Sequence, residues 1–341
     1  AQFLEYLESG ERDPEEITFM EPQAGGACRA GNIYNLLQRV LYRMVEQGQL
    51  EYAQIPVISL NLMGEEKHTG FRITPSLLSG GIAAGCYGDL IMCLYQQVKP
   101  YEQNPGETDR IRSQVEKKLC ESIRRHRNGR HTREKNYRYA CEVFSKVPVK
   151  PGKKKRVGIT GEIYMKYSKL GNDDIESFLL RQGMEPYSGG FVNYCLYLVD
   201  TERYKVEKYQ HNPIMAKACA FVLHRLCEAQ KHLLTVIGET DRFQTDLPFP
   251  ELKEKVQGIL AEGCNTGDGW LIAAEVIQYV EKGCGSVLIL HPFGCLVSHV
   301  CERGILQRLH ARFPDVSIQT IEYDYDQSKT LRESRILLAI S

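Results

Sequence analysis

The feature that most constrains this chain is an alternation of short apolar strands, glycine-containing turns and helices, which occurs in both halves of the sequence. In the first half, the strand-like residues 17–22 precede a glycine-rich turn and a segment, residues 32–48, with apolar positions at helical spacing. In the second half, residues 286–292 form a similar strand before a turn and a helix. Because parallel strands need crossover helices, this alternation predicts an α/β fold with parallel sheets.

A proline- and glycine-containing segment, residues 147–155, is expected to separate two domains. The length of 341 residues fits about two domains of about 150 residues each. We therefore expect an N-terminal α/β domain over residues 1–150 and a C-terminal α/β domain over residues 151–341. Each is expected to be a doubly wound parallel sheet of the Rossmann or flavodoxin type, with a cleft between the two. The basic run at residues 153–156 is typical of a solvated linker, and a phosphate or nucleotide contact is the alternative.

Two further stretches of the first half have helical patterns. Residues 75–98 are apolar, and glycines around Gly80 and Gly85 are expected to break them. Residues 107–145 are polar and rich in Arg and Lys, which predicts one long helix or a pair of helices.

The composition excludes several classes of partner. Lys plus Arg and Asp plus Glu both number 43, so the net charge is zero and no global basic field for nucleic acid is expected. No apolar run of about 18 residues and no signal peptide are evident, so we expect a cytoplasmic protein without a membrane partner. The chain begins with alanine in a charged segment, which we interpret as a piece of a longer polypeptide.

The chain has twelve cysteines, and three of them share one kind of position. Most are expected to be small buried hydrophobic residues with reduced thiols. Cys28, Cys264 and Cys295 instead lie beside glycine, each just before a helix-like segment. Such turns lie at the carboxyl edge of a parallel sheet, where ligands bind, and thiolates are the ligands of soft metal sites. An iron–sulfur cluster is therefore the first hypothesis, and ordinary turns that happen to contain cysteine are the alternative.

Glycine beside each cysteine would let the backbone approach a bulky inorganic group. The residues expected to line the cofactor in this way are Gly26, Gly263 and Gly294. No CxxC pair and no GxxxxGK[ST] loop are present, so neither a structural zinc site nor ATP hydrolysis by this chain is expected.

Three other residues are candidates for catalysis. Glu162 follows the predicted strand 156–161, so it would lie at the same edge of the sheet or cap a helix. His299 follows Cys295 by four residues, and it is expected to orient or pack, with a catalytic Cys–His pair as an alternative. Tyr87 lies in the sequence GCYGDL, where a surface turn is the alternative.

Over nearly its whole length the chain resembles the dehydratase-like C-terminal portion of the large acyl-CoA dehydratase activase-related proteins. The stretches that carry the resemblance are GGACRAGNIYNLLQRVL, IPVISLNLMG, GFRITPSLL, YGDLIM, RVGITGEIYMKY, CNTGDGWLIAAEVI, HPFGCLVSHVCERGILQRL and IEYDYDQS. These proteins are related to the iron–sulfur subunits of 2-hydroxyacyl-CoA dehydratases, to benzoyl-CoA reductase and to double-cubane cluster proteins.

The resemblance implies a 4Fe–4S cluster held between two α/β domains by Cys28, Cys264 and Cys295, and we expect its fourth position to be open or to have a ligand other than cysteine. A double-cubane 8Fe–9S cluster, the alternative, would need further thiolates, for which Cys86 and Cys301 are the candidates. The resemblance also implies low-potential electron transfer or reductive activation of an acyl-CoA or another small molecule in anaerobic metabolism. The electron would come from an ATPase activase that carries its own 4Fe–4S cluster, and a homodimer is expected. A non-catalytic cluster carrier or interaction module, and a relic of the fold without a cluster, are the rival hypotheses.

Overall fold

The computed structural model describes residues 9, 16–22, 29–48, 57–60, 74–324 and 326–341. Contacts divide the chain into two compact units, Ala1–Arg72 and Ile73–Ser341. In the first unit, β1 (Phe19–Pro22) pairs in parallel with β2 (Val57–Leu60), in the register Phe19 to Val57. The short helix η2 (Arg29–Asn32) and α2 (Ile33–Glu46) lie between them in sequence, so the predicted strand and helix are confirmed, and the predicted glycine-rich turn lies outside the described residues.

The second unit contains a four-stranded sheet in the order β4-β3-β5-β6, with every neighbouring pair parallel. Its strands are β3 (Arg156–Gly161), β4 (Glu185–Tyr187), β5 (Ser286–Pro292) and β6 (Ser317–Tyr323). The predicted α/β class and parallel pairing are therefore confirmed. The domain boundary near residue 150 and a cleft between two domains stay predictions.

Helices cover both faces of this sheet. Successive side chains of a strand point to opposite faces, so each central strand contributes to a core on either side. Val287 and Ile289 of β5 belong to a large core with α11 (Gly269–Glu281). Leu288 and Leu290 belong to a smaller core on the other face. The helices α6 (Ile163–Tyr167), α7 (Ile175–Arg181) and α13 (Lys329–Ile340) complete the smaller core, while α10 (Phe249–Glu254) and α12 (Leu306–Arg312) contribute to the larger one.

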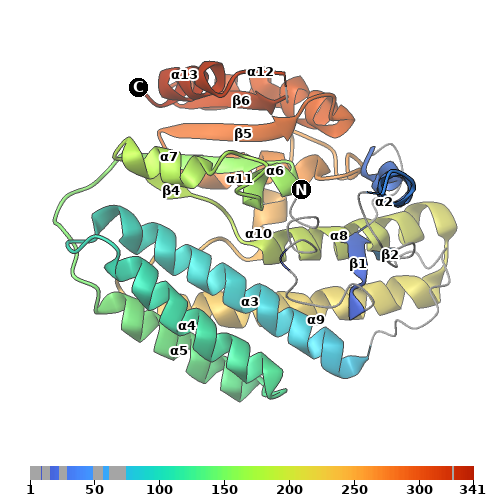
Figure 1. Cartoon of the computed structure of the whole chain (residues 1–341), viewed down its shortest axis with the longest axis horizontal. Coiled ribbons are helices and arrows are strands. Elements are labelled where there is room, and N and C mark those ends of the chain that lie inside the picture. The colour runs from blue at the N-terminus through green and yellow to red at the C-terminus, as the bar shows by residue number, and fades with distance from the viewer. Residues whose placement is uncertain (1–8, 10–15, 23–28, 49–56, 61–73, 325) are drawn as a thin grey trace. The chain divides into compact units, whose positions relative to one another are not determined.

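A group of helices extends the larger core away from the sheet (Figure 1). Its members are α3 (Pro75–Val98), α4 (Glu107–Arg124), α5 (Arg130–Ser145), α8 (Phe191–Lys205) and α9 (Pro213–Gly238). The short helices η3 (Lys99–Tyr101) and η4 (Val206–Gln210) follow α3 and α8, and η5 (Ser298–Glu302) and η6 (Arg303–Ile305) lie between β5 and α12. The helix pair predicted over residues 107–145 is confirmed as α4 and α5.

The central helix α3 corrects two expectations. It is continuous through Gly80 and Gly85, because it packs against α4, α5, α8 and α9 and that contact outweighs the poor helix propensity of glycine. With η3 it forms 27 residues that are apolar and long enough to cross a bilayer, so the expectation that no segment meets this test was wrong. Leu90, Leu94 and Val98 of this helix are completely buried in the larger core.

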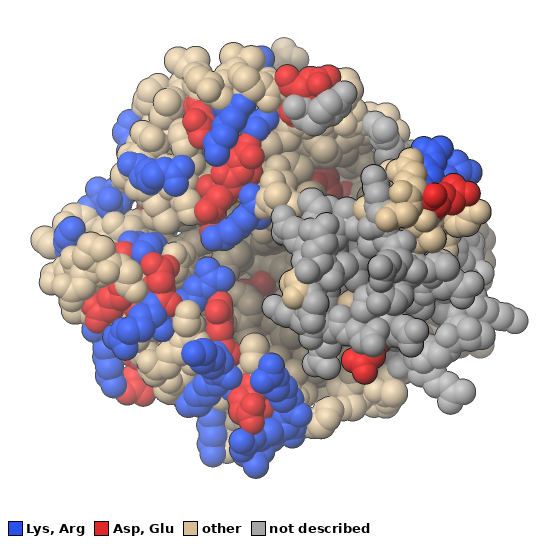
Figure 2. All heavy atoms as spheres, in the orientation of Figure 1, with Lys and Arg blue, Asp and Glu red and all other residues tan. Residues whose placement is uncertain are grey.

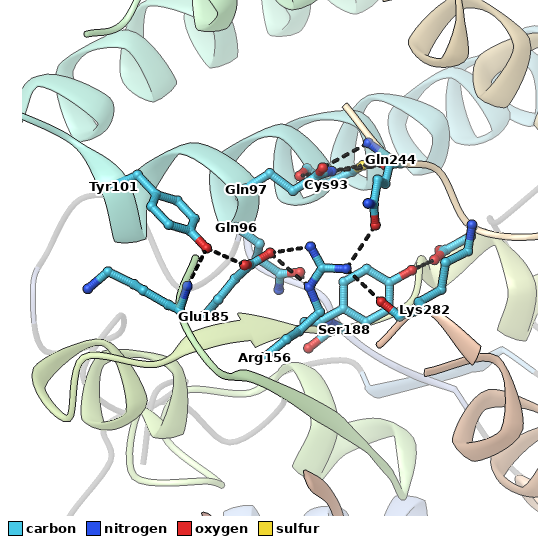
Figure 3. Close-up of polar contacts among 12 residues, drawn as sticks. Cys93, Gln96, Gln97, Tyr101, Arg156, Glu185, Ser188, Gln244 and Lys282 are labelled. Carbon is cyan, nitrogen blue, oxygen red and sulfur yellow. Dashed lines mark hydrogen bonds and ion pairs between the residues drawn. The ribbon is translucent and has the colours of Figure 1, made fainter. Parts of the chain in front are cut away.

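Arg156, the first residue of β3, joins the sheet to the end of α3 (Figure 3). Its guanidinium donates to Glu185 at 2.6 and 2.9 Å and to the backbone oxygen of Lys282 at 2.9 Å. The hydroxyl of Tyr101 donates to the second oxygen of Glu185 at 2.7 Å. This buried network fixes the amino end of the sheet, opposite the edge at which the predicted site residues lie.

Candidate functional site

The carboxyl ends of β3 and β5 meet at one edge of the sheet, because the two strands are parallel neighbours paired from Val157–Ser286 to Gly161–Leu290. Glu162 follows β3 directly, and its backbone N–H donates to the oxygen of Leu290 at 2.8 Å. Gly161 has a φ of +129°, and a Cβ there would lie 2.0 Å from that oxygen. Only glycine can bring the chain this close to β5, so the position of Glu162 depends on it.

Cys295 lies in the turn after β5. Its N–H donates to the oxygen of Pro292 at 3.2 Å, and Gly294 has a φ of +70°, which favours glycine at that place. The thiol is half-buried, and loss of solvent raises its pKa. Ser298 lowers the pKa in part, whereas the nearby carboxyls of Glu302 and Glu162 raise it further.

Cys264 lies in the loop before α11, and its backbone is held closely. Its N–H donates to the oxygen of Ala261 at 2.9 Å, and its own oxygen accepts from the N–H of Trp270 at 2.9 Å. A Cβ at Gly269 would lie 2.3 Å from the oxygen of Cys264. A Cβ at Gly263 would lie 3.1 Å from the hydroxyl of Tyr204, so this neighbouring glycine also allows a close approach.

A third thiol, that of Cys301, is influenced electrostatically by Cys264 and Cys295. It lies on η5 and is 7% exposed. Burial raises the pKa of its thiol to about 11, and the charges of Cys264, Glu302 and Cys295 raise it further. The charges of Cys264 and Cys295 therefore reach the thiol of Cys301.

Three carboxyls with raised pKa values influence one another at this edge, and two of them, Asp268 and Glu302, are buried. Burial raises the pKa of Glu302 to about 8, that of Asp268 well above its usual range, and that of Glu162 to a smaller extent. The negative charges of Glu162 and Glu302 add to the rise at Asp268. Ser298 partly offsets the rise at Glu302, yet neither carboxyl oxygen of Glu302 makes a well-formed hydrogen bond within the described residues.

The structure describes the other predicted residues, with two exceptions. His299 orients the Cys295 turn, because its Nδ1 lies 2.7 Å from the oxygen of Cys295 and its backbone N–H also donates to that oxygen. Glu162 accepts from the N–H of Met165 and so also caps α6. Cys28 and Gly26 lie outside the described residues.

Two predicted residues lie in α3, within the core of the helical group. Tyr87 accepts a hydrogen bond from Asn136 at 2.7 Å and packs edge-on against Tyr137. Cys86 is 1% exposed, and burial raises the pKa of its thiol to about 11. Its neighbours are Asp89, Tyr137 and Arg133, so it is not part of the thiol group of Cys264, Cys295 and Cys301.

Sequence reasoning missed Asp268 and Glu302. Asp268 lies in CNTGDGW, a stretch whose resemblance to a phosphate-binding turn could have marked it. Glu302 has no local signal, because only the π-helical turn η5 brings it back toward Asp268 and Glu162. The same turn contains Cys301.

Thiolates are the ligands of soft metals, and Cys264, Cys295 and Cys301 influence one another electrostatically at this edge. They do not form a closed set: within the described residues, no three His, Cys, Asp or Glu side chains are arranged to hold a metal ion. Comparison with protein-family models, curated proteins and solved structures gave no match.

Proposed function

We propose that this chain is an iron–sulfur protein whose cluster is held at the carboxyl edge of the sheet by Cys264 and Cys295, with Cys28 as the third ligand. The observation that supports the proposal is that Cys264 and Cys295 lie in two different loops and that both influence the pKa of the Cys301 thiol on η5. Cys301 is the candidate for a fourth thiolate. A 4Fe–4S cluster fits this number of thiols better than a double-cubane cluster, which needs more.

The protein would position such a cluster and determine the polarity and charge around it. Such a cluster, when bound, supplies one-electron chemistry at low potential. Gly294 and Gly263 let the two cysteine loops come close, and His299 holds the oxygen of Cys295 in place. Burial raises the pKa values of the three carboxyls beside the thiols, so protonated carboxyls would reduce the negative charge near thiolates.

We further propose a role in an ATP-dependent reductase or dehydratase system, in which a partner ATPase with its own 4Fe–4S cluster delivers the electron. The resemblance of the cysteine-containing stretches supports this role. Large apolar side chains are also exposed beside Cys295, namely Phe293, Leu296 and Val300. Such side chains at one edge are typical of a surface that another protein or segment covers. The substrate would be an acyl-CoA or another small molecule.

Anaerobic purification and reconstitution test the proposal. We expect a coloured protein that contains iron and acid-labile sulfide in equal amounts. A colourless protein without iron after reconstitution would contradict it. Titration with a CoA ester then separates an enzyme from a carrier: an enzyme should bind the ester, whereas a carrier that only passes electrons should not.

A further inference from the structure

The turn between α4 and α5 is strongly basic, although the whole chain has no net charge. The eight residues 124–131 have the sequence RRHRNGRH, with four arginines, two histidines and no acidic residue. Arg124, Arg125, Arg127 and Arg130 are all exposed. Figure 2 shows Lys and Arg gathered at the place where Figure 1 has this end of the α4–α5 pair, at the lower edge of the view.

Most of this positive charge has no partner among the described residues. Arg125 pairs with Glu121 on α4. The side chains of Arg124, Arg127 and Arg130 make no hydrogen bond or ion pair with the described residues. The next acidic residue of α5, Glu134, is already paired with Arg138 and His232. Three free guanidinium groups therefore lie within one turn.

The start of α5 adds donors at the same place. Gly129 is the N-cap, and no side chain caps the helix. The first turn has no acidic residue and begins with Arg130 and His131. The backbone N–H groups of a first helical turn have no partner within the helix, and cations at this end are unfavourable. The sequence thus places positive charge where an isolated helix would favour negative charge. A bound anion would offset this unfavourable charge.

Hydrogen bonds fix the turn in this shape. The N–H of Arg127 donates to the oxygen of Ser122 at 2.9 Å, and the hydroxyl of Ser122 donates back to the oxygen of Arg127 at 3.0 Å. Arg133 donates to the oxygen of Asn128 at 3.2 Å. Asn128 is 5% exposed, and its side-chain oxygen has no partner among the described residues. Because an amide oxygen accepts and does not donate hydrogen bonds, this atom would not contact a phosphate group, so the donors that this turn offers are its arginines and the N–H groups of α5.

We propose that the α4–α5 turn binds a phosphate-bearing small molecule through its pyrophosphate or polyphosphate group. Arginine, with its planar fork of donors, suits phosphate oxygens better than lysine does, and this turn contains only arginine of the two. Three free arginines and the N–H groups of α5 match a group with three or four negative charges. A nucleic acid would use a longer basic stripe, whereas the free arginines of this patch gather in one turn, and the test below compares the two ligands directly. The proposal is independent of the cysteine site.

Calorimetric titration of the full chain with inorganic pyrophosphate at low ionic strength tests the proposal. The variant Arg127→Gln/Arg130→Gln should weaken binding at least about tenfold, because two charge-assisted hydrogen-bonding groups are lost. The control Lys208→Gln/Lys217→Gln removes the same charge from two exposed lysines without partners near the α8–α9 connection, and it should change affinity less than about twofold.

Melting temperatures measured with and without pyrophosphate test the proposal even if the arginine variant differs in stability from the native chain. Without ligand, the arginine variant should melt at the same or a higher temperature, because it removes cations from a helix start. Pyrophosphate should raise the melting temperature of the native chain and of the lysine control, but not that of the arginine variant. Three outcomes would overturn the proposal: a dissociation constant above about 1 mM, equal losses in the two variants, or tighter binding of a single-stranded oligonucleotide than of pyrophosphate.

Discussion

The ammonium group of Lys166 lies 2.8 and 2.9 Å from the two carboxylate oxygens of Glu275, and both side chains are only 3% exposed. Lys166 is on α6 and Glu275 is on α11, so the pair joins the two helices that begin at the carboxyl edge of the sheet. Thr160 of β3 also donates to Glu275, at 2.5 Å. This pair therefore holds Glu162 and the Cys264 loop in a fixed relation.

Replacement of Lys166 by methionine should destabilise the protein strongly, because it leaves the charge of Glu275 buried without a partner. Breaking one side of such a pair costs about 3–5 kcal/mol of unfolding free energy. Urea unfolding would measure the loss. The control is Lys169→Met, since Lys169 is 62% exposed and pairs with Asp174 at 3.6 Å, and it should cost less than about 1 kcal/mol. Equal losses in the two variants would contradict the structural role of the Lys166–Glu275 pair.

Gly161→Ala should also be strongly destabilising. Its φ of +129° is unfavourable for alanine, and the new Cβ would lie 2.0 Å from the backbone oxygen of Leu290. Backbone strain and overpacking together predict a loss of about 3 kcal/mol or more. Gly88 of α3 is a matched control, because a Cβ there meets nothing within 4 Å. Gly88→Ala should leave stability unchanged or raise it by about 0.5–1 kcal/mol. Chemical denaturation that ranks the two variants in the opposite order would be incompatible with this geometry.

The stability of the protein should depend on pH through Asp89. This residue is half-buried, but its carboxylate end is enclosed, which raises its pKa from 3.8 to about 7. The titratable groups that face it are Asp246, Lys166, Cys86, Cys93 and Cys195. The folded state therefore holds a proton that the unfolded state releases near pH 4. The stabilisation from Asp89 is fully present below that pH and is lost as the pH rises through about 7.

Unfolding free energies of Asp89→Asn between pH 4 and pH 7 check this sign. The variant should show a smaller fall of stability with rising pH than the native chain. Asp109 is the opposite case: partial burial raises its pKa, but hydrogen bonds from Lys99 and Tyr95 outweigh this effect and lower the pKa below 3.8. Its contribution is complete above about pH 4 and is lost as the pH falls below that value, so Asp109→Asn should lose less stability than the native chain when the pH is lowered from about 4 to about 2. Identical pH profiles for the native chain and Asp89→Asn would rule out the role given to Asp89.

The regular elements of this fold were predictable where a pattern continues over several residues. β3 and β5 have the bounds that their apolar runs predict, because central parallel strands are buried on both faces. β4 has only three residues, Glu185–Tyr187, one of which is proline, and no apolar run marks it. The continuity of α3 through its glycines comes from packing against distant helices, which a local pattern does not contain.

The site was predictable only in part, for a similar reason. Cys264 and Cys295 have glycine neighbours, and this local signal marked both. The carboxyls of Asp268 and Glu302 influence one another across 34 residues of sequence, and that nearness arises from the fold. Sequence patterns indicate which turns lie at a sheet edge, but they do not say which side chains of other segments meet there.

Iron bound per chain after anaerobic reconstitution tests the central claim most directly, when measured in native protein and in single cysteine variants. The account predicts iron and sulfide in the native chain, a clear loss in Cys264→Ser and in Cys295→Ser, and no change in Cys120→Ser, whose side chain is exposed on α4. Circular dichroism would confirm that each variant is folded. Iron content that is the same in Cys264→Ser, Cys295→Ser and the native chain would contradict a cluster at this edge.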